Sequence, residues 1–359
     1  MCGGFVCLLI LATEALLRWQ FGKIDRITGA AEWTVGKFGD LTYHWDRYDP
    51  RYGWTNIAGY HSDERIPFRV TINHQGLRGL SDYAASPPEG VTRIAMFGDS
   101  CTFGEEVDDD QTIAAYLERH LRDVEVLNFG VHGYGLGQMV MRMEDEAFAL
   151  HPDRIVITVL LPMDLYRDPM PNYVYNKPVF SATNGDLQIL NVPVPEASQE
   201  PWLYRHSFAA AWFFARAQAH EMPPDVTALV ATTKAILRRA KELCDEHDVK
   251  LTVVAILTYG TIEELGSDPQ TRELLTFLTH SLREANVDVV DLLPFLERRY
   301  TDEGKALTKQ FGHWSGRGNC LIASQIAAHL AASPGLDLAE DVASICEPAA
   351  TEKSSAPAP

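Results

Sequence analysis

Short apolar runs alternate with longer amphipathic stretches through most of the chain, from about residue 91 to residue 332. This alternation is typical of a parallel sheet whose two faces are covered by helices. We expect five buried strands, over residues 93–97, 124–128, 154–160, 250–257 and 287–292. The helical patterns between and after them lie near residues 111–122, 136–150, 223–247, 269–285 and 317–332. The pattern therefore predicts an α/β domain with a five-stranded parallel sheet.

The N-terminus has a different pattern. Residues 3–17 are almost wholly apolar, interrupted only by Thr13 and Glu14, and Arg18 follows directly. The run is short for a helix that spans a membrane, which needs about 20 residues. It also lacks the basic start and the small-residue cleavage site of a secretory signal. We expect residues 1–22 to form a hydrophobic anchor or signal-like helix, with an amphipathic or buried helix as the alternative.

Three other segments complete the organisation around the main domain, which we place at residues 91–333. Residues 23–90 are rich in aromatic residues, glycine and proline, which predicts an irregular leader packed on that domain. Residues 163–222 are expected to form an insertion over the strand ends, where doubly wound folds bind their ligands. The composition of residues 334–359 predicts a disordered tail.

Charge and cysteine content exclude some classes of function. The net charge of −18 argues against a nucleic-acid partner, because binding phosphates requires a basic surface. The six cysteines are scattered without a C-x-x-C pair, so neither a zinc framework nor a disulfide scaffold is indicated. If the domain is exported, one or two disulfides are a remaining possibility. No metal and no organic cofactor is implied.

The main chemical signal follows the first strand, at Gly98-Asp99-Ser100. An apolar strand runs into a turn that contains glycine, and a helical pattern follows. Ser100 is therefore expected at the carboxyl end of the strand, near amides that can bind an oxyanion. We expect Asp99 to organise the turn and not to take part in catalysis. The G-x-S-x-G elbow of larger α/β hydrolases is not matched, because Thr102 replaces its second glycine.

Two further blocks follow strand-like runs. Asn128 begins a glycine-rich loop that includes Gly133, and its backbone amides are expected in the same crevice, with a plain structural turn as the alternative. His313 lies between the fifth strand and the last helix. A serine hydroxyl needs a base to become a nucleophile, and histidine is the usual base. Position therefore favours His313 among the 12 histidines.

In order and spacing, these blocks resemble the SGNH (GDSL-type) hydrolases, over about residues 91–332. The segment from Tyr48 to Gly79 is similar to the leader of membrane-anchored bacterial members. That family has a three-layer, flavodoxin-like fold and includes esterases, lipases and carbohydrate deacetylases. The resemblance implies that Ser100 is the nucleophile and His313 the base. It also implies that the amides of Ser100 and Gly133 form part of an oxyanion hole.

The chain departs from the family pattern in two places. Met163 stands where the family has an asparagine that donates to the oxyanion, and a thioether cannot donate. Gln310 and Phe311 occupy the positions where an acid normally precedes the catalytic histidine. Gln310 could orient the ring by a hydrogen bond. Asp302 and Glu303 are the nearby acids that could substitute from another backbone position.

Asp164 follows the third strand, and its carboxylate allows two interpretations. It either holds the active-site loops together, as the matching aspartate of the family suggests, or caps the next helix.

The leading hypothesis is a serine hydrolase that cleaves an ester through an acyl-serine intermediate, with O-acyl groups of a glycan as candidate substrates. One alternative is an O-acyltransferase that uses the same Ser100 and His313. The other is a catalytically weakened or inactive binding module, which Met163 and the missing acid support. The expected partner is a small-molecule or glycan ester, with membrane association through the N-terminus. By the positive-inside rule, Arg18, Lys23 and Arg26 after the apolar run would place that side in the cytoplasm. The resemblance implies the opposite, with the domain on the extracytoplasmic face, and we follow the resemblance.

Overall fold

The computed structural model describes eleven stretches of the chain. They are residues 2–21, 36–38, 41–173, 175–196, 206–210, 212, 225–258, 260–263, 268–309, 312–339 and 345–346.

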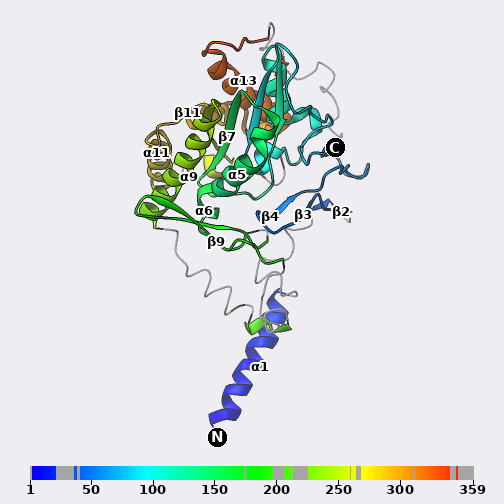
Figure 1. Ribbon diagram of the computed structural model, residues 1–359. Coiled ribbons are helices and arrows are strands. Elements are labelled where there is room, and N and C mark those ends of the chain that lie inside the picture. Colours follow the sequence, from blue (N-terminus) through cyan, green and yellow to red (C-terminus); the bar gives the residue numbers. More distant parts are fainter. Residues whose placement is uncertain are drawn as a thin grey trace.

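A five-stranded parallel sheet forms the centre of the protein (Figure 1). Its strands are β5 (Thr92–Phe97), β6 (Val124–Asn128), β7 (Arg154–Leu161), β10 (Lys250–Leu257) and β11 (Asp288–Asp291). The spatial order is β11-β10-β7-β5-β6, and all four neighbouring pairs are parallel. Every residue of β7 is buried, because helices cover both faces of the sheet. The predicted fold class is confirmed, and each strand coincides with one of the five apolar runs.

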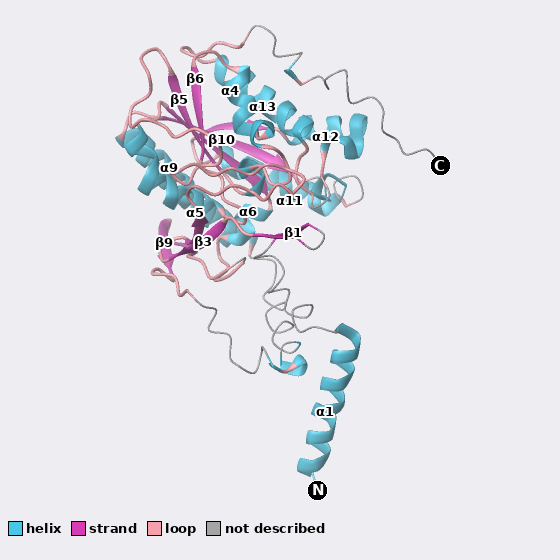
Figure 2. Cartoon of the chain, turned by 90° about the vertical axis from the view of Figure 1, so that its right-hand side faces the viewer, coloured by secondary structure: helices cyan, strands magenta, loops and turns pink. Residues whose placement is uncertain are grey.

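Helices form two layers, one on each side of the sheet (Figure 2). On one side α4 (Ile113–His120) packs against α13 (Gly316–Ala331). On the other side α5 (Leu136–Arg142) and α11 (Pro269–Arg283) pack against α9 (Val226–Glu246). The remaining helical segments are α3 (Ser100–Phe103), η1 (Asp109–Gln111), η2 (Met143–Ala147), η3 (Phe148–Leu150), α6 (Met163–Arg167), α12 (Leu293–Glu303) and η4 (Gly304–Leu307). The helix α12 was not predicted.

The leader contains two small hairpins and a core of its own. The strands are β1 (Gly36–Phe38), β2 (Leu41–Tyr43), β3 (Asp46–Asp49) and β4 (Gly53–Asn56). Trp54 is fully buried and belongs to the main hydrophobic core. Trp45, Val70 and Ile72 form a second cluster with Phe103 of α3. The leader therefore packs directly on the helix that begins with Ser100.

The region predicted as an insertion contains a hairpin of β8 (Val179–Thr183) and β9 (Asp186–Leu190). This hairpin packs against α9, where Arg238 donates to the carbonyl of Gly185 at 3.1 Å. Residues 197–205 and 213–224 of the predicted insertion lie outside the described residues.

The N-terminal residues form α1 (Cys2–Phe21), which lies apart from the α/β domain in both views (Figures 1 and 2). Glu14 accepts hydrogen bonds from the amides of Phe208 and Ala209, at 3.0 and 2.9 Å. Within the described residues, no helix has both the length and the apolar character needed to cross a membrane. Anchoring by residues 1–22 stays a prediction.

The C-terminal segment differs in part from the predicted disordered tail. Leu336 is buried, and the carbonyl of Asp337 accepts from the amide of Arg122 at 2.9 Å. Further on, Cys346 forms a disulfide with Cys320 of α13. These contacts hold parts of the segment against α4 and α13. Residues 347–359 lie outside the described residues.

Candidate active site

The turn after β5 presents Ser100 at the carboxyl end of the sheet. A side chain at Gly98 would overlap the hydroxyls of Thr102 and Thr158, so only glycine fits there. Ser100 is the first residue of α3, and Asp99 caps this helix by accepting from the amide of Cys101 at 2.9 Å. The prediction that Asp99 organises its turn agrees with this contact.

A buried ion network that includes Arg167 of α6 fixes the side chain of Asp99. Arg167 of α6 donates through Nη1 to Asp99 Oδ2 at 3.1 Å and to Asp164 Oδ1 at 2.7 Å. The other oxygen of Asp164 accepts from the amide of Leu160 at 2.7 Å. Burial raises the pKa of Asp164 well above its ordinary value; the charge of Asp99 adds to this, and Arg167 opposes it. Of the two interpretations of Asp164, the structure therefore favours the one in which it holds the loops together.

The glycine-rich loop after β6 lies beside the Ser100 turn. The amide of Val131 donates to the carbonyl of Gly98 at 3.1 Å, and Asn128 Nδ2 donates to the carbonyl of Thr102 at 2.8 Å. Gly133 has φ = +71°, a conformation that favours glycine. Among the described residues, neither the Ser100 amide nor the Gly133 amide has a hydrogen-bond acceptor. Both amides are thus available to a ligand, although both residues are buried.

His313 lies in the loop between η4 and α13. Trp314 is buried directly after it, and its indole N–H donates to the carbonyl of Leu257 at the end of β10 at 3.0 Å. The carbonyl of His313 accepts from the amide of Lys309 at 2.8 Å. These contacts fix the backbone of His313 at the carboxyl end of the sheet, where Ser100 also lies.

Two consecutive carboxylates of the loop after α3 face the imidazole. Nδ1 of His313 lies 2.9 Å from Oε2 of Glu106, and Nε2 lies 3.4 Å from Oε2 of Glu105. The amide of Glu105 in turn donates to the carbonyl of Ser100 at 3.1 Å. Ser100 Oγ lies 3.5 Å from Asp99 Oδ2, and no direct hydrogen bond joins it to His313 among the described residues. Glu105 therefore lies next to both predicted catalytic residues.

The surroundings of His313 favour its protonated form. Burial alone would lower the pKa of the imidazole, but the charge of Glu105 and the hydrogen bond and charge of Glu106 outweigh it. Asp99 adds a smaller effect in the same direction. The net result is a pKa above the ordinary 6.5.

A second histidine, His132, lies close to the same group. Its Nδ1 accepts the indole N–H of Trp45 at 3.1 Å, and its Nε2 lies 3.4 Å from Oδ2 of the buried Asp46. Because an indole N–H can only donate, Nδ1 must be the unprotonated nitrogen. His132 Nδ1 is thus occupied as an acceptor, which leaves His313 as the better candidate for a base.

The acids that the sequence suggested for His313 do not reach it. Glu303 is paired with Arg299, at 3.1 Å, and with Arg317. Asp302 is exposed on α12. Gln310 lies outside the described residues. The acids that do contact His313, Glu105 and Glu106, follow the nucleophile block in sequence. The signal that could have found them is a pair of consecutive glutamates just after the predicted nucleophile turn.

Met163 begins α6 directly after β7 and is half-buried. Its correspondence to the asparagine of the family stays a prediction.

One group of possible metal ligands occurs among the described residues. His120, Cys320 and Cys346 place one ligand atom each within 4.8 Å of one another. The two sulfur atoms are joined in a disulfide, so neither is a thiolate. The group therefore does not offer the donor set of a zinc site.

A family model described as "SGNH hydrolase-like domain, acetyltransferase AlgX" matches residues 209–355, which include His313. The chain carries an SGNH hydrolase-like domain. No curated protein sequence matches the chain significantly.

Several solved structures are similar to this chain. The lipase/acylhydrolase from Enterococcus faecalis is 16% identical, with a TM-score of 0.40 over 70% of this chain and 100% of that chain. A member of the lipolytic protein G-D-S-L family from Veillonella parvula is 16% identical, with a TM-score of 0.40 over 66% and 97%. The acetyl xylan esterase AlAXEase is 14% identical, with a TM-score of 0.41 over 66% and 99%.

Proposed function

We propose that this protein is a serine-dependent ester hydrolase that removes an O-acyl group, with acylated glycans as the substrate class. The observation that carries the proposal is the placement of the half-buried His313 against two carboxylates, Glu105 and Glu106, of the loop that follows the Ser100 helix α3. The amides of Ser100 and Gly133 support it, because neither has an acceptor among the described residues and an oxyanion needs unoccupied donors.

In the proposed reaction, Ser100 Oγ attacks the acyl carbonyl while its proton passes to Nε2 of His313. The amides of Ser100 and Gly133 stabilise the negative oxygen of the tetrahedral intermediate. Collapse of the intermediate expels the alcohol, which takes the proton from His313 and leaves an acyl-serine. Water then attacks this ester while His313 accepts one of its protons. The second tetrahedral intermediate collapses, the carboxylic acid leaves, and His313 returns the proton to Ser100 Oγ. For these steps Nε2 has to exchange its contact with Glu105 for one with Ser100 Oγ.

A second candidate is O-acyl transfer, in which a sugar hydroxyl replaces water in the last step. It is favoured by the family match, because the matching model is described as an acetyltransferase. Both reactions use Ser100 and His313 and share the acyl-serine. They differ in the acceptor alone.

The test is a comparison of wild type with Ser100→Ala on aryl acetates and on acetylated oligosaccharides. Ser333→Ala is the matched control, because Ser333 lies far from the proposed site. It lines a cavity with Arg154 and Lys250, which are the first residues of β7 and β10, and Ser100 lies at the carboxyl ends of the strands. We expect Ser100→Ala alone to lose activity. Mass spectrometry of a quenched reaction should detect one acyl group on the peptide that contains Ser100.

Adding an unacylated oligosaccharide separates the two candidates. Acylated oligosaccharide as the main product indicates transfer, and free acid indicates hydrolysis. Equal rates for wild type and Ser100→Ala on every ester, together with no acylated peptide, would overturn both.

A further inference from the structure

In this sequence Gln310 and Phe311, and not an acid, occupy the positions where the family has the acid partner of the histidine. In the structure, an acid from the loop after α3 contacts His313 instead. We propose that Glu106 is the positioning carboxylate of His313, and that the leader holds it there by clamping the segment that follows Glu106. The kinetic part of this inference rests on the proposed function, whereas the contact itself can be tested without any activity.

The first step is the geometry of the pair. Glu106 Oε2 lies 2.9 Å from His313 Nδ1, and Glu106 is 8% exposed. A carboxylate at this distance accepts the Nδ1 hydrogen, which fixes the tautomer and leaves Nε2 as the nitrogen that can take a proton. Glu105 faces Nε2 at 3.4 Å and therefore cannot hold the hydrogen on Nδ1. It stabilises the imidazolium, but it also occupies the side from which Ser100 has to approach.

The second step is the backbone of Glu106. Its φ of +65° is a left-handed conformation that a residue with a long side chain rarely adopts. Such a conformation persists where the surrounding structure enforces it. It turns the chain directly after Glu105, so that two consecutive carboxylates face two different nitrogens of one ring.

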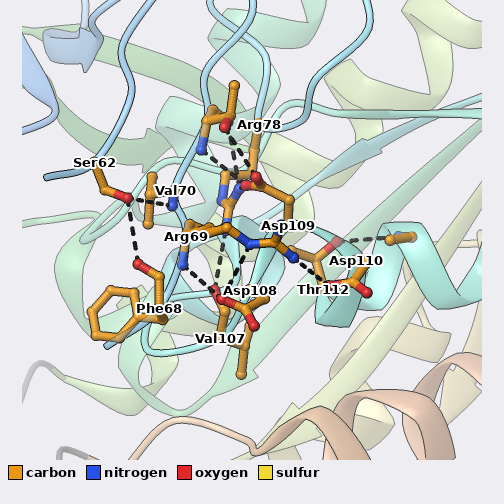
Figure 3. Close-up of polar contacts among 12 residues, drawn as sticks. Ser62, Phe68, Arg69, Val70, Arg78, Val107, Asp108, Asp109, Asp110 and Thr112 are labelled. Atoms are coloured by element: carbon orange, nitrogen blue, oxygen red, sulfur yellow. Dashed lines mark hydrogen bonds and ion pairs between the residues drawn. The ribbon is translucent and has the colours of Figure 1, made fainter. Parts of the chain in front are cut away.

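The third step is the clamp, which involves only the leader and the residues just after Glu106 (Figure 3). Arg78 is fully buried, pairs with Asp109 and donates through Nη2 to the carbonyl of Val107 at 3.2 Å. Thr71 donates its amide and its hydroxyl to the two carboxylate oxygens of Asp109, both at 2.9 Å. The amide of Arg69 donates to Asp108 Oδ1 at 2.7 Å. The three residues after Glu106 are thus all bound by the leader.

Within the part of the chain that the structure describes, the charged groups that face His313 are Glu105 and Glu106 after α3 and Asp99 at the start of α3. His132, from the loop after β6, lies 3.6 Å from Glu105 through its Nδ1. All three carboxylates favour the imidazolium, but only Glu106 bonds the nitrogen that stays protonated through the reaction. Removing the charge of Glu106 and removing that of Glu105 should therefore have different consequences for catalysis.

The experiment measures the pKa of His313 by NMR titration of its imidazole in the full chain, and in parallel the pH dependence of kcat. The variants are Glu106→Gln, Glu105→Gln and the control Asp110→Asn, which removes an exposed carboxylate two residues beyond the clamped Asp108. We expect the pKa of His313 to fall in both glutamine variants and to stay constant in the control. We expect kcat to fall about 10²-fold or more in Glu106→Gln with little change in KM, and less than tenfold in Glu105→Gln.

Two further variants complete the test. Glu106→Asp keeps the charge but shortens the side chain, so the pKa should stay raised while kcat falls; it also serves if Glu106→Gln does not fold. Thr71→Val removes one bond of the clamp at nearly constant volume, and it should lower kcat in the same direction as Glu106→Gln.

An unchanged pKa of His313 in Glu106→Gln would overturn the inference, as would an equal loss of kcat in Glu105→Gln and Glu106→Gln. If Ser100→Ala retained full activity, the proposed function would fail, but the NMR titration would still decide whether Glu106 holds His313.

Discussion

Arg167 Nη1 lies 3.1 Å from Asp99 Oδ2, so the residue before Ser100 is bound to a helix that follows a different strand. The same nitrogen also donates to Asp164 at 2.7 Å. One guanidinium nitrogen therefore binds two buried carboxylates, and this ion network joins the carboxyl ends of β5 and β7.

Replacing Arg167 with methionine should leave two buried carboxylates without their cation. Removing one partner of a buried pair costs about 3–5 kcal/mol, because the remaining charge is uncompensated. We expect a loss of this size in the free energy of unfolding, measured by urea denaturation. The control is Arg272→Met, whose exposed pair with Glu297 should contribute at most about 1 kcal/mol. Equal losses in the two variants would contradict the assigned role of Arg167.

Gly98→Ala should displace the turn that carries Ser100. The added methyl group overlaps two threonine hydroxyls, and overpacking of this kind costs about 1–3 kcal/mol. We expect lower stability together with lower activity, measured by thermal unfolding and by the ester assay. Gly260→Ala is the matched control, because a Cβ there would meet only Thr258 Oγ1 at 3.9 Å. If Gly98→Ala were as stable and active as this control, the close packing of the turn would not matter.

The sheet could be predicted from the sequence because its strands are buried on both faces and read as continuous apolar runs. The run over 124–128 coincides with β6, and the run over 250–257 with β10. The helix α12 was missed. Only Leu296 of its residues is fully buried, so its apolar face gives a weak signal.

The acid of the site could not be predicted by position, because the resemblance directs attention to the residues just before His313. Glu106 is 207 residues away in sequence, and its approach depends on a positive φ and on the clamp by the leader. Neither feature has a pattern in the sequence. Ser100 and His313 themselves were placed by local signals, namely the glycine turn after an apolar strand and the loop before the last helix.

Activity should depend on pH through His313. The imidazole acts as a base only when it is neutral, and its pKa is raised above 6.5 because Glu105 and Glu106 outweigh the effect of burial. The acid limb of kcat/KM against pH should therefore have its midpoint above 6.5, since this ratio reports the free enzyme. In Glu106→Gln the midpoint should move to lower pH. A wild-type midpoint at or below the ordinary value would contradict the raised pKa.

The disulfide between Cys320 and Cys346 should stabilise the C-terminal segment on α13. It closes a separation of 26 residues. In the chain-entropy description, a loop of this size contributes about 3–4 kcal/mol. We expect a reducing agent to lower the free energy of unfolding of the wild type by this order. The double variant Cys320→Ser, Cys346→Ser is the control, and its stability should not respond to the reducing agent. A response of the same size in both proteins would show that the effect does not come from the Cys320–Cys346 disulfide.

Met163→Asn should raise activity if the oxyanion site lacks one donor. Met163 begins α6 at the end of β7, where an asparagine side chain could add an N–H to the amides of Ser100 and Gly133. Because the loss of one such donor typically costs about 10²–10³ in rate, we expect kcat to increase by up to about 10²-fold. Met170→Asn, at an exposed position of the same region, is the control and should have no effect on kcat. If Met163→Asn also left kcat unchanged while Ser100→Ala abolished it, the two backbone amides alone would be sufficient for the oxyanion.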